Sequence, residues 1–280
     1  MTARVVVTGA SGRLGRAVVA ELQSTGQFEV TGFVSPRVVP RAGEVAVDLL
    51  SAASIHDAMD AAKPDVVVHL GGRVPTNATS AEDFEVHHSS TAAIVDATAA
   101  WEPRVILAST AAVYGDQGTR SFRESDPVTL GSDYATSKYR AEQVLLASTA
   151  ETLSLRIFNV FGPGFDDSIV TKLQVATEDR PAPLRGWRSF ERDYIHVSDV
   201  AVAVRLAVDC TLPTRHVTLN IGSGVATSNR DLVTAMSARL SLHYALVDWP
   251  PSHNVADVAA ARAVLGFSAL VRPEDIQARH

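Results

Sequence analysis

The chain has 280 residues, of which 46% are hydrophobic and 20% are charged, and its formal net charge is -6. This ordinary globular composition excludes intrinsic disorder, collagen and a small disulfide-rich scaffold. Lys and Arg are not concentrated in any one segment, so nucleic acid is not an expected partner. Cys210 is the only cysteine, which excludes an intramolecular disulfide and a zinc site made of cysteines.

The N-terminal residues run directly into a strand-like segment without the layout of a signal peptide. No apolar stretch approaches the ~20 residues that a membrane-spanning helix needs. We therefore expect a cytoplasmic protein that does not contact a membrane, and the single cysteine fits a reducing compartment.

Short β-branched runs alternate with longer alanine-rich stretches in the first part of the chain. This alternation predicts an α/β fold, a Rossmann-type doubly wound parallel sheet. The predicted strands are 4–8, 28–34, 65–70, 104–109 and 153–158, and the predicted helices are 13–24, 53–62, 81–100 and 133–149.

After residue 158, glycines and prolines interrupt any long element, which predicts a smaller C-terminal substrate lobe. A helix-like segment at 198–208 and a strand-like segment at 216–221 then return to the sheet. We expect a dinucleotide-binding domain of residues 1–158 plus about 193–222, and a substrate lobe of about 159–192 plus 223–280.

The first predicted strand leads into the first predicted helix through a motif with three evenly spaced glycines. Such glycines let the backbone turn tightly and approach a pyrophosphate, while the helix N-terminus supplies N–H groups and a positive dipole. Its position between a strand and a helix strengthens this interpretation. The candidate phosphate-binding residues are Gly9, Ser11, Gly12, Arg13, Leu14 and Gly15.

The loop after the second predicted strand bears on the choice of cofactor. An acidic residue about 20 positions beyond the glycines binds the ribose 2′-hydroxyl of NAD, whereas an Arg accommodates the 2′-phosphate of NADP. No acid lies between Val30 and Gly43, while Ser35, Arg37 and Arg41 follow the strand. This pattern favours NADP(H) and leaves NAD(H) open, because the arginines could also be solvated loop charges.

Three residues form the candidate catalytic group. Tyr134 and Lys138 are four residues apart on a predicted helix, so their side chains lie on one face. Shifting a phenol pKa from about 10 to about 7 takes roughly 4 kcal/mol, which a nearby Lys138 ammonium could help supply, making Tyr134 a general acid/base. Thr110 lies at the carboxyl end of a predicted strand, where open α/β sheets bind ligands. Together they predict a hydride-transfer site.

Further motifs follow one another in a recognisable order. They are Asp48-Leu49, His69-Leu70-Gly71-Gly72, Ser109–Gly115, Arg156–Gly162, Arg192–Val197 with Asp199-Val200, Asn220-Ile221-Gly222 and Asp257–Phe267. With the glycine motif and the Tyr-Lys pair, the sequence resembles the extended short-chain dehydrogenase/reductase family. The resemblance covers nearly the whole chain, and it is to the branch of NAD(P)-dependent sugar-nucleotide epimerases, dehydratases and 4-ketoreductases.

The resemblance implies roles for individual residues. Thr110 and Tyr134 would be catalytic, and Lys138 would assist Tyr134 and hydrogen-bond the nicotinamide ribose. Asn159 and Arg192 would hold substrate, with Arg192 on a diphosphate, unless they are a turn asparagine and the partner of Asp193 in a structural ion pair. Asp48 would contact the adenine amino group, and further cofactor-lining residues would be Leu49, Leu70, Gly71, Gly72 and Ala108.

The sequence also departs from the family pattern. Ala111-Ala112 stands where dehydratases carry Asp-Glu, so a 4,6-dehydratase is not expected. Segment 249–254 lacks the second arginine that clamps the diphosphate in many relatives, and Arg185 or Arg188 could replace it or be exposed charges. His87-His88 stands where relatives often have Asn, and we assign this pair no chemistry and predict no metal site.

These observations favour an NAD(P)-dependent reductase or epimerase acting at a secondary alcohol or ketone, foremost C4 of a nucleotide sugar. The short substrate lobe and the incomplete clamp keep a non-nucleotide substrate open, such as a free sugar acid or a natural-product ketone. A non-catalytic dinucleotide-binding sensor is the alternative of another class. The resemblance further implies a homodimer through the helices at 81–100 and 133–149, and a structural role for Tyr194 and His196.

Overall fold

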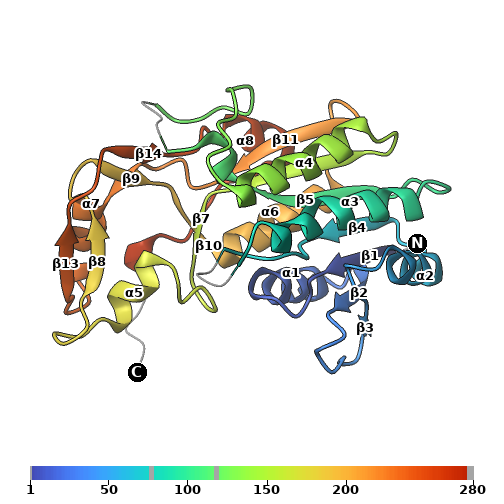
Figure 1. The fold of residues 1–280 in the computed structure, drawn as a ribbon, viewed down its shortest axis with the longest axis horizontal. Coiled ribbons are helices and arrows are strands. Elements are labelled where there is room, and N and C mark those ends of the chain that lie inside the picture. Colours follow the sequence, from blue (N-terminus) through green and yellow to red (C-terminus); the bar gives the residue numbers. More distant parts are fainter. Residues whose placement is uncertain (1, 76–78, 117–119, 276–280) are drawn as a thin grey trace.

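A seven-stranded parallel sheet forms the centre of the computed structural model, which describes residues 2–75, 79–116 and 120–275. The strand order is β11-β6-β5-β4-β1-β2-β3. The chain moves outward in one direction from β1 and in the other from β4, so the topology switches between these two strands. Ligands of open α/β sheets bind at such a switch, beyond the carboxyl ends of the strands. The doubly wound α/β fold predicted from the sequence is confirmed (Figure 1).

The predicted elements of the sheet are all present, with ends within a few residues of the prediction. Only β3 was not predicted, and it is a three-residue edge strand with two exposed side chains, so it lacks a hydrophobic pattern. The strands are β1 Ala3–Thr8, β2 Phe28–Val34, β3 Glu44–Ala46, β4 Val66–His69, β5 Arg104–Thr110, β6 Thr152–Ile157 and β11 His216–Ile221.

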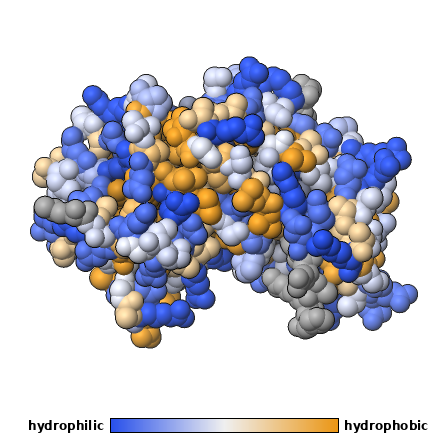
Figure 2. All heavy atoms as spheres, turned by 180° about the vertical axis from the view of Figure 1, so that it is seen from behind, coloured by the Kyte–Doolittle hydropathy of each residue, from blue (hydrophilic) through white to orange (hydrophobic). Residues whose placement is uncertain are grey.

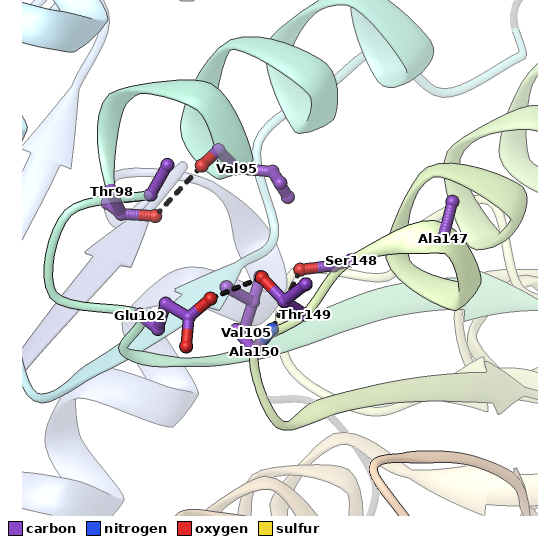
Figure 3. Close-up of a pocket in the computed structure, with 9 residues that line it drawn as sticks. Val95, Thr98, Glu102, Val105, Ala147, Ser148, Thr149 and Ala150 are labelled. Atoms are coloured by element: carbon purple, nitrogen blue, oxygen red, sulfur yellow. Dashed lines mark hydrogen bonds between the residues drawn. The ribbon is translucent and has the colours of Figure 1, made fainter.

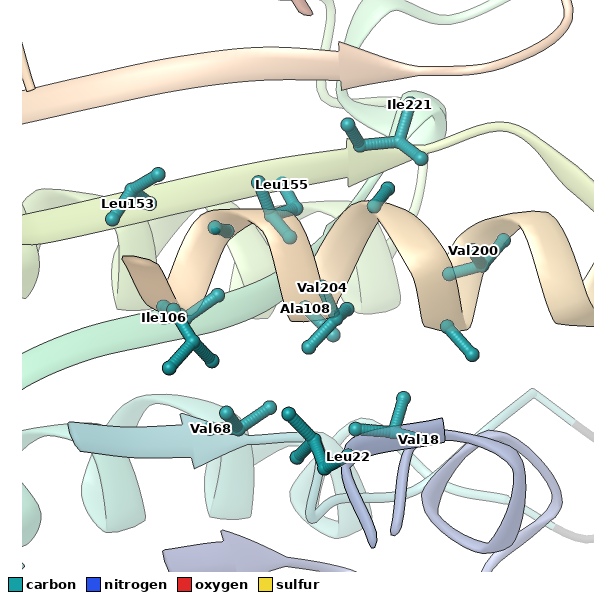
Figure 4. Packing of buried hydrophobic residues seen from close by; sticks show 14 of the residues in the cluster. Val18, Leu22, Val68, Ile106, Ala108, Leu153, Leu155, Val200, Val204 and Ile221 are labelled. Atoms are coloured by element: carbon teal, nitrogen blue, oxygen red, sulfur yellow. The ribbon is translucent and has the colours of Figure 1, made fainter. Parts of the chain in front are cut away.

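Helices cover both faces of the sheet, because successive strand residues point to opposite faces. Val5 and Val7 pack in the cluster shared with α1 (Arg13–Ser24) and α6 (Val197–Asp209), and Figure 4 shows Val18 of α1 and Val204 of α6 in this cluster. Val6 packs on the other face with α2 (Ala52–Ala62), α3 (Glu85–Ala97) and α4 (Asp133–Ala147). Short 3-10 turns, η1 (Glu82–Phe84) and η2 (Ala111–Tyr114), precede α3 and follow β5.

The remaining elements lie beyond the carboxyl edge of the sheet, on the left in Figure 1. A separate apolar cluster, which includes Phe161, Leu173, Leu184 and Leu232, forms the core there. The elements are β7 Asn159–Phe161, α5 Ile169–Val175, β8 Ala182–Arg185, β9 Phe190–Arg192, β10 Tyr194–His196, β12 Thr227–Ser228, α7 Asn229–Ser237, β13 Tyr244–Val247, β14 Ser252–Asn254 and η3 Pro273–Asp275.

Helix α8 (Ala259–Leu265) shows that the chain does not divide simply at residue 223. Ala261, Leu265 and Phe267 pack in the cluster of the central sheet with α6 and β11, although we assigned this segment to the substrate lobe. The two-lobe division proposed from the sequence therefore stays a prediction, and the packing argues for moving α8 to the dinucleotide-binding side.

Polar and apolar side chains are mixed over the face shown in Figure 2, with apolar ones gathered toward its middle. Among the described residues, no helix combines the length and the hydropathy needed to cross a bilayer.

Candidate active site

The turn after β1 is tight enough that two of its positions must be glycine. Gly9 has φ +68°, and a Cβ there would lie 2.8 Å from the Cα of Gly71, which follows β4. A Cβ on Gly15 would lie 2.1 Å from the carbonyl oxygen of Gly9. The glycines therefore bring the turn, the start of α1 and the end of β4 into close contact, as the motif predicts.

The N-terminus of α1 is chemically suited to an anion. Its N-cap residue is Gly12, no side chain caps the helix, and the first turn carries no acidic residue. The first N–H groups of a helix have no partner within the helix, and its dipole is positive at this end. The turn and the helix end therefore fit the pyrophosphate of a dinucleotide.

Arg13, one of the candidate phosphate-binding residues, is directed away from the turn. Its guanidinium lies 4.7 Å from the centre of the Phe165 ring and forms an ion pair with Asp167. Its side chain also lies close to Gly164. Arg13 thus connects the first turn of α1 to the segment that follows β7.

The other candidate cofactor residues lie around the same edge. Ser35 and Arg37 are exposed after β2, and the Ser35 hydroxyl accepts a hydrogen bond from the Arg37 N–H at 3.3 Å. The exposed Asp48 accepts one from the Leu50 N–H at 3.0 Å. The remaining contact is hydrophobic: the Leu49 side chain packs against Gly71.

Thr110 and Tyr134 meet at the carboxyl end of β5. Thr110 is the last residue of β5 and caps η2, accepting a hydrogen bond from the Ala112 N–H at 3.2 Å. Tyr134 lies in the first turn of α4, which Ser132 caps. The Thr110 hydroxyl lies near enough to the Tyr134 phenol to lower the pKa of that phenol, so the two predicted catalytic hydroxyls are brought together.

Lys138 lies one helical turn beyond Tyr134 and is buried. Its ammonium donates a hydrogen bond to the carbonyl oxygen of Ala108 at 2.8 Å. Burial lowers the pKa of Lys138 to about 8, and the charge of Glu142 opposes this effect. The lysine is therefore held at the end of β5, beside the predicted site.

Burial determines the direction of the Tyr134 pKa shift. It raises the pKa of the phenol, and the Thr110 hydroxyl and the Arg13 charge offset only part of that effect. The expected depression toward 7 stays a prediction, because a bound nicotinamide would add positive charge beside Lys138, whose ammonium donates to the Ala108 carbonyl. Tyr134 is therefore a protonated phenol at neutral pH in this structure.

A buried histidine, which the sequence analysis named only as part of the motif 69–72, supports the turn. The Gly71 N–H donates to the Thr8 hydroxyl at 3.1 Å, and that hydroxyl lies 2.7 Å from Nδ1 of His69. Nε2 of His69 lies 2.9 Å from the Ser90 hydroxyl, which in turn donates to the carbonyl of Val86. Burial and the charge of Lys138 lower the pKa of His69 to about 3, so the ring is neutral.

A buried ion pair lies behind the catalytic group. Arg156 on β6 contacts Glu142 on α4 at 2.7 Å, and the Ser109 hydroxyl also donates to this carboxylate. Glu142 lies one turn beyond Lys138 on the same helix face. Tyr134, Lys138 and Glu142 therefore follow one stripe of α4, and this continuation could have been read from the four-residue spacing.

The predicted substrate residues lie where the lobe meets the sheet. Asn159 donates from its side-chain amide to the carbonyl of Asp193 at 3.1 Å. Arg192 does not pair with Asp193, which corrects that alternative. The Asp193 carboxylate instead accepts hydrogen bonds from the backbone of Ser223 and Gly224, while Arg192 is bound elsewhere.

Arg192 is held by four groups, one of which is the Glu191 carbonyl at 2.9 Å. Its guanidinium lies 3.1 Å from Asp116 and 2.9 Å from the Ser252 hydroxyl, and it covers the ring of Phe190 at 3.8 Å. Burial lowers the pKa of Arg192, and the charge of Asp116 opposes that shift. This arginine is therefore fixed in place, and its ion-pair partner, the Asp116 carboxylate, is exposed.

Three further sequence candidates have packing contacts. The Arg185 guanidinium lies over the Trp249 ring at 4.3 Å. Tyr194 is buried in the core of the lobe, and His196 caps α6 while its ring contacts Phe161 edge to face at 5.2 Å.

Figure 3 shows a small cavity of about 190 Å³ that belongs to the opposite edge of the sheet. The ends of α3 and α4 and the beginning of β5 line it, with Glu102 and Thr149 hydrogen-bonded across its wall. Thr110 lies at the other end of β5, so this cavity is separate from the candidate active site.

Comparison with known proteins decides the family. The profile of the NAD dependent epimerase/dehydratase family matches residues 5–222, which spans the glycine motif and the catalytic group. The chain belongs to this family. It is therefore an oxidoreductase-type enzyme with a nicotinamide dinucleotide cofactor, and the predicted membership of the extended short-chain dehydrogenase/reductases is confirmed.

Curated family members share about a quarter of the sequence. The chain is 28% identical to a UDP-glucose 4-epimerase of Azospirillum brasilense, over 83% of this chain and 76% of that one. It is 27% identical to a GDP-6-deoxy-D-talose 4-dehydrogenase of Aggregatibacter actinomycetemcomitans, over 80% and 76%.

Solved structures agree with this family assignment. MoeE5 in complex with UDP-glucuronic acid and NAD matches with a TM-score of 0.82 and 27% identity, covering 97% of this chain and 95% of that one. The enzyme assignment disfavours the non-catalytic sensor that we considered from the sequence.

Proposed function

We propose that the protein is an NAD(P)-dependent oxidoreductase or epimerase that transfers hydride at C4 of a nucleotide sugar. The observation that carries this proposal is the meeting of Thr110, Tyr134 and Lys138 at the end of β5, close to the uncapped start of α1. The names of the UDP-glucose 4-epimerase and the GDP-6-deoxy-D-talose 4-dehydrogenase support C4 of a nucleotide sugar.

The roles of the residues follow from their chemistry. When bound, the nicotinamide accepts a hydride from the carbinol carbon or returns one to the ketone. Tyr134 gives its proton to the carbonyl oxygen during reduction and takes it back during oxidation. Thr110 orients that oxygen through its hydroxyl, and the Lys138 ammonium favours the phenolate that forms when Tyr134 has lost its proton.

The loop after β2 and the incomplete diphosphate clamp favour a reductase, since an epimerase must keep both cofactor and substrate through its cycle. A ketone needs a proton donor as it accepts hydride, and the Tyr134 phenol, whose pKa burial raises, can supply that proton. Ala111 and Ala112 follow Thr110, so neither position supplies the carboxylate that would assist loss of water. We therefore place a 4-ketoreductase first and a 4-epimerase second.

For the cofactor we propose NADP(H) first and NAD(H) second. Ser35 and Arg37 are exposed beyond β2, and no acid lies between Val30 and Gly43. The structure of MoeE5 is with NAD, so the NADP preference rests on this loop alone. A comparison of KM for NADPH and NADH tests it, and a strong preference for NADH would refute the role of Arg37.

A second candidate is a reductase of a substrate without a nucleotide, such as a sugar acid or a natural-product ketone. The ion pair between Arg192 and Asp116 favours it, because the arginine that was expected to bind a diphosphate already forms an ion pair with a carboxylate. The lack of an arginine in segment 249–254 points the same way.

The decisive experiment combines binding and turnover. Mass spectrometry of the purified protein identifies the dinucleotide and any nucleotide that accompany it. UDP-glucose and UDP-glucuronic acid are then supplied with NAD or NADP, and release of reduced cofactor is followed beside sugar epimerisation. Net release of reduced cofactor supports a reductase or dehydrogenase, whereas epimerisation of the sugar without such release supports an epimerase. If no nucleotide sugar gives either result, the first proposal is refuted.

We also propose a homodimer formed through α3 and α4, on the family resemblance. The two helices already lie side by side in one chain, where Arg140 pairs with Glu85. Light scattering gives the mass in solution, and a monomer would refute this proposal.

A further inference from the structure

Tyr134 lies against two other aromatic rings that the proposed reaction does not use. Phe84 ends η1 and His87 lies in the first turn of α3. The centre of the Tyr134 ring lies 5.6 Å from each of the other two, at interplanar angles of 65° to Phe84 and 76° to His87. Both contacts are edge to face, which is a favoured geometry for aromatic pairs.

Phe84 and His87 also support each other. Their rings are stacked at 6.3 Å with an interplanar angle of 12°, as expected for residues three apart on a helical turn. The two rings contact Tyr134 from η1 and α3, while Thr110 approaches its hydroxyl from β5. The phenol is therefore fixed at both its ring and its oxygen.

The orientation of the His87 ring is itself determined. Its Nε2 lies 2.8 Å from the carbonyl oxygen of Arg73, and because a carbonyl only accepts, Nε2 carries the hydrogen. A Cβ on Gly72 would lie 2.2 Å from Cε1 of the ring, so glycine at this position makes the space for it. His87 is only 2% exposed.

His87 is neutral and makes no hydrogen bond through its second nitrogen. Burial and the charge of Lys138 lower its pKa to about 2. Nδ1 is buried without a partner among the described residues, so the ring is oriented by the bond to Arg73 and by its aromatic contacts. A neutral ring adds no positive charge beside Tyr134.

We propose that His87, together with Phe84, is a positioning residue that holds the Tyr134 ring so that its hydroxyl meets Thr110 and the reacting oxygen. This inference rests on the proposed function, in which Tyr134 transfers the proton. It assigns a role to His87, which stands where relatives often have Asn and which the sequence analysis left without a role. The ring, rather than a nitrogen atom, is the part of His87 that acts.

Two substitutions at residue 87 separate the ring from the hydrogen bond. His87→Gln keeps an N–H that can reach the Arg73 carbonyl but has no ring, whereas His87→Phe keeps a ring but has no N–H. We expect kcat to fall about 10- to 100-fold in the Gln variant, because small misplacements of reacting groups have effects of this size. The Phe variant should stay within about threefold of the wild type.

The assay follows oxidation of UDP-glucose through formation of reduced dinucleotide, with dinucleotide Kd measured by fluorescence in parallel. Kd should stay within about twofold in both variants, since a positioning role changes kcat and not cofactor binding. His88→Gln, the same change one residue along α3, is the matched control because His88 contacts Arg140. Equal activity of the wild type and His87→Gln would overturn the proposal, as would an equal loss in His87→Phe.

A measurement that needs no turnover keeps this test separate from that of the proposed function. The chain has 5 tyrosines, and carbon-13 labelling of tyrosine with Tyr134→Phe as reference assigns the Tyr134 ring signal. That signal should move toward the position of an exposed tyrosine in His87→Gln, but not in His87→Phe or His88→Gln. An unmoved signal overturns the inference, whereas inactivity of the wild type refutes only the proposed function.

Phe84→Leu provides a second variant should His87→Gln fail to fold. It removes the other ring while keeping a buried apolar side chain, and we expect the same loss of kcat and the same movement of the Tyr134 signal. An unchanged kcat and signal in this variant would equally overturn the proposal.

Discussion

Arg192 and Asp116 form an ion pair of 3.1 Å in which the guanidinium side chain is 10% exposed and the carboxylate side chain is 57% exposed. The cation is thus fixed and desolvated, whereas the anion can leave into solvent. A phosphate or carboxylate of a substrate that bound Arg192 would take the place of Asp116, because both anions would seek the same N–H groups.

Arg192→Ala tests whether a nucleotide binds at this position. Loss of a charge-assisted contact should weaken binding of UDP by about 10- to 100-fold. Asp116→Asn is the opposite variant, and it should strengthen UDP binding because it removes the competing carboxylate. Calorimetric titration with UDP measures both, and unchanged affinities in both variants would favour the substrate without a nucleotide.

Tyr134→Phe tests the proton transfer. The variant keeps the ring and its contacts with Phe84 and His87 but has no hydroxyl, so kcat should fall about 100-fold or more. The dinucleotide Kd should change little. Steady-state rates and fluorescence titration check both statements, and a fully active variant would exclude Tyr134 as the acid/base.

Lys138 predicts how activity depends on alkaline pH. Burial lowers its pKa to about 8, so the ammonium is present below pH 8 and is lost as the pH rises through that value. If the ammonium supports Tyr134, kcat in the oxidation direction should decline above about pH 8 after correction for the equilibrium. Lys138→Arg keeps its charge and should shift that decline to higher pH, and a profile identical to the wild type would contradict the assignment.

The same shift has a consequence for stability. An unfolded lysine has a pKa of about 10.4, so between about pH 8 and 10.4 the unfolded chain binds more protons than the folded one. This group therefore makes the folded state more stable as the pH rises across that window. Urea denaturation of the wild type and Lys138→Met at both ends of the window measures it.

Arg156 and Glu142 predict a large effect on folding. Both side chains are buried, and removing one leaves the other charge without its partner. Arg156→Leu should lower the free energy of unfolding by about 3–5 kcal/mol, whereas changing both residues to apolar ones should restore much of it. Urea denaturation measures this, and a small effect of the single variant would show that water reaches the pair.

Local patterns predicted the sheet well because each buried strand carries its own signal. Segment 28–34 combines β-branched and aromatic residues, and β2 has the predicted bounds. The edge strand β3 carries no such signal, since Val45 and Ala46 are exposed. The helix predicted to end at 100 ends at Ala97, where the Thr98 hydroxyl bonds back to the preceding turn.

The candidate site divides in the same way. Tyr134 and Lys138 could be paired from sequence because one helix places them together. The partners of Arg192 and of Arg13 could not, because Asp116 and Asp167 are far away along the chain and no periodicity links them. The contact of His87 with Tyr134 could not be predicted for the same reason, since the two rings meet only when α3 and α4 pack side by side.

Arg13 begins the helix of the proposed dinucleotide site, yet its guanidinium is held by Phe165 and Asp167 beyond β7. One side chain thus connects the proposed cofactor site to the proposed substrate lobe. Coupling between two binding sites is reciprocal. If a molecule that rearranges segment 162–168 changes the affinity of the protein for the dinucleotide by some factor, the dinucleotide changes the affinity for that molecule by the same factor. Arg13 is then the side chain through which the two proposed sites are coupled.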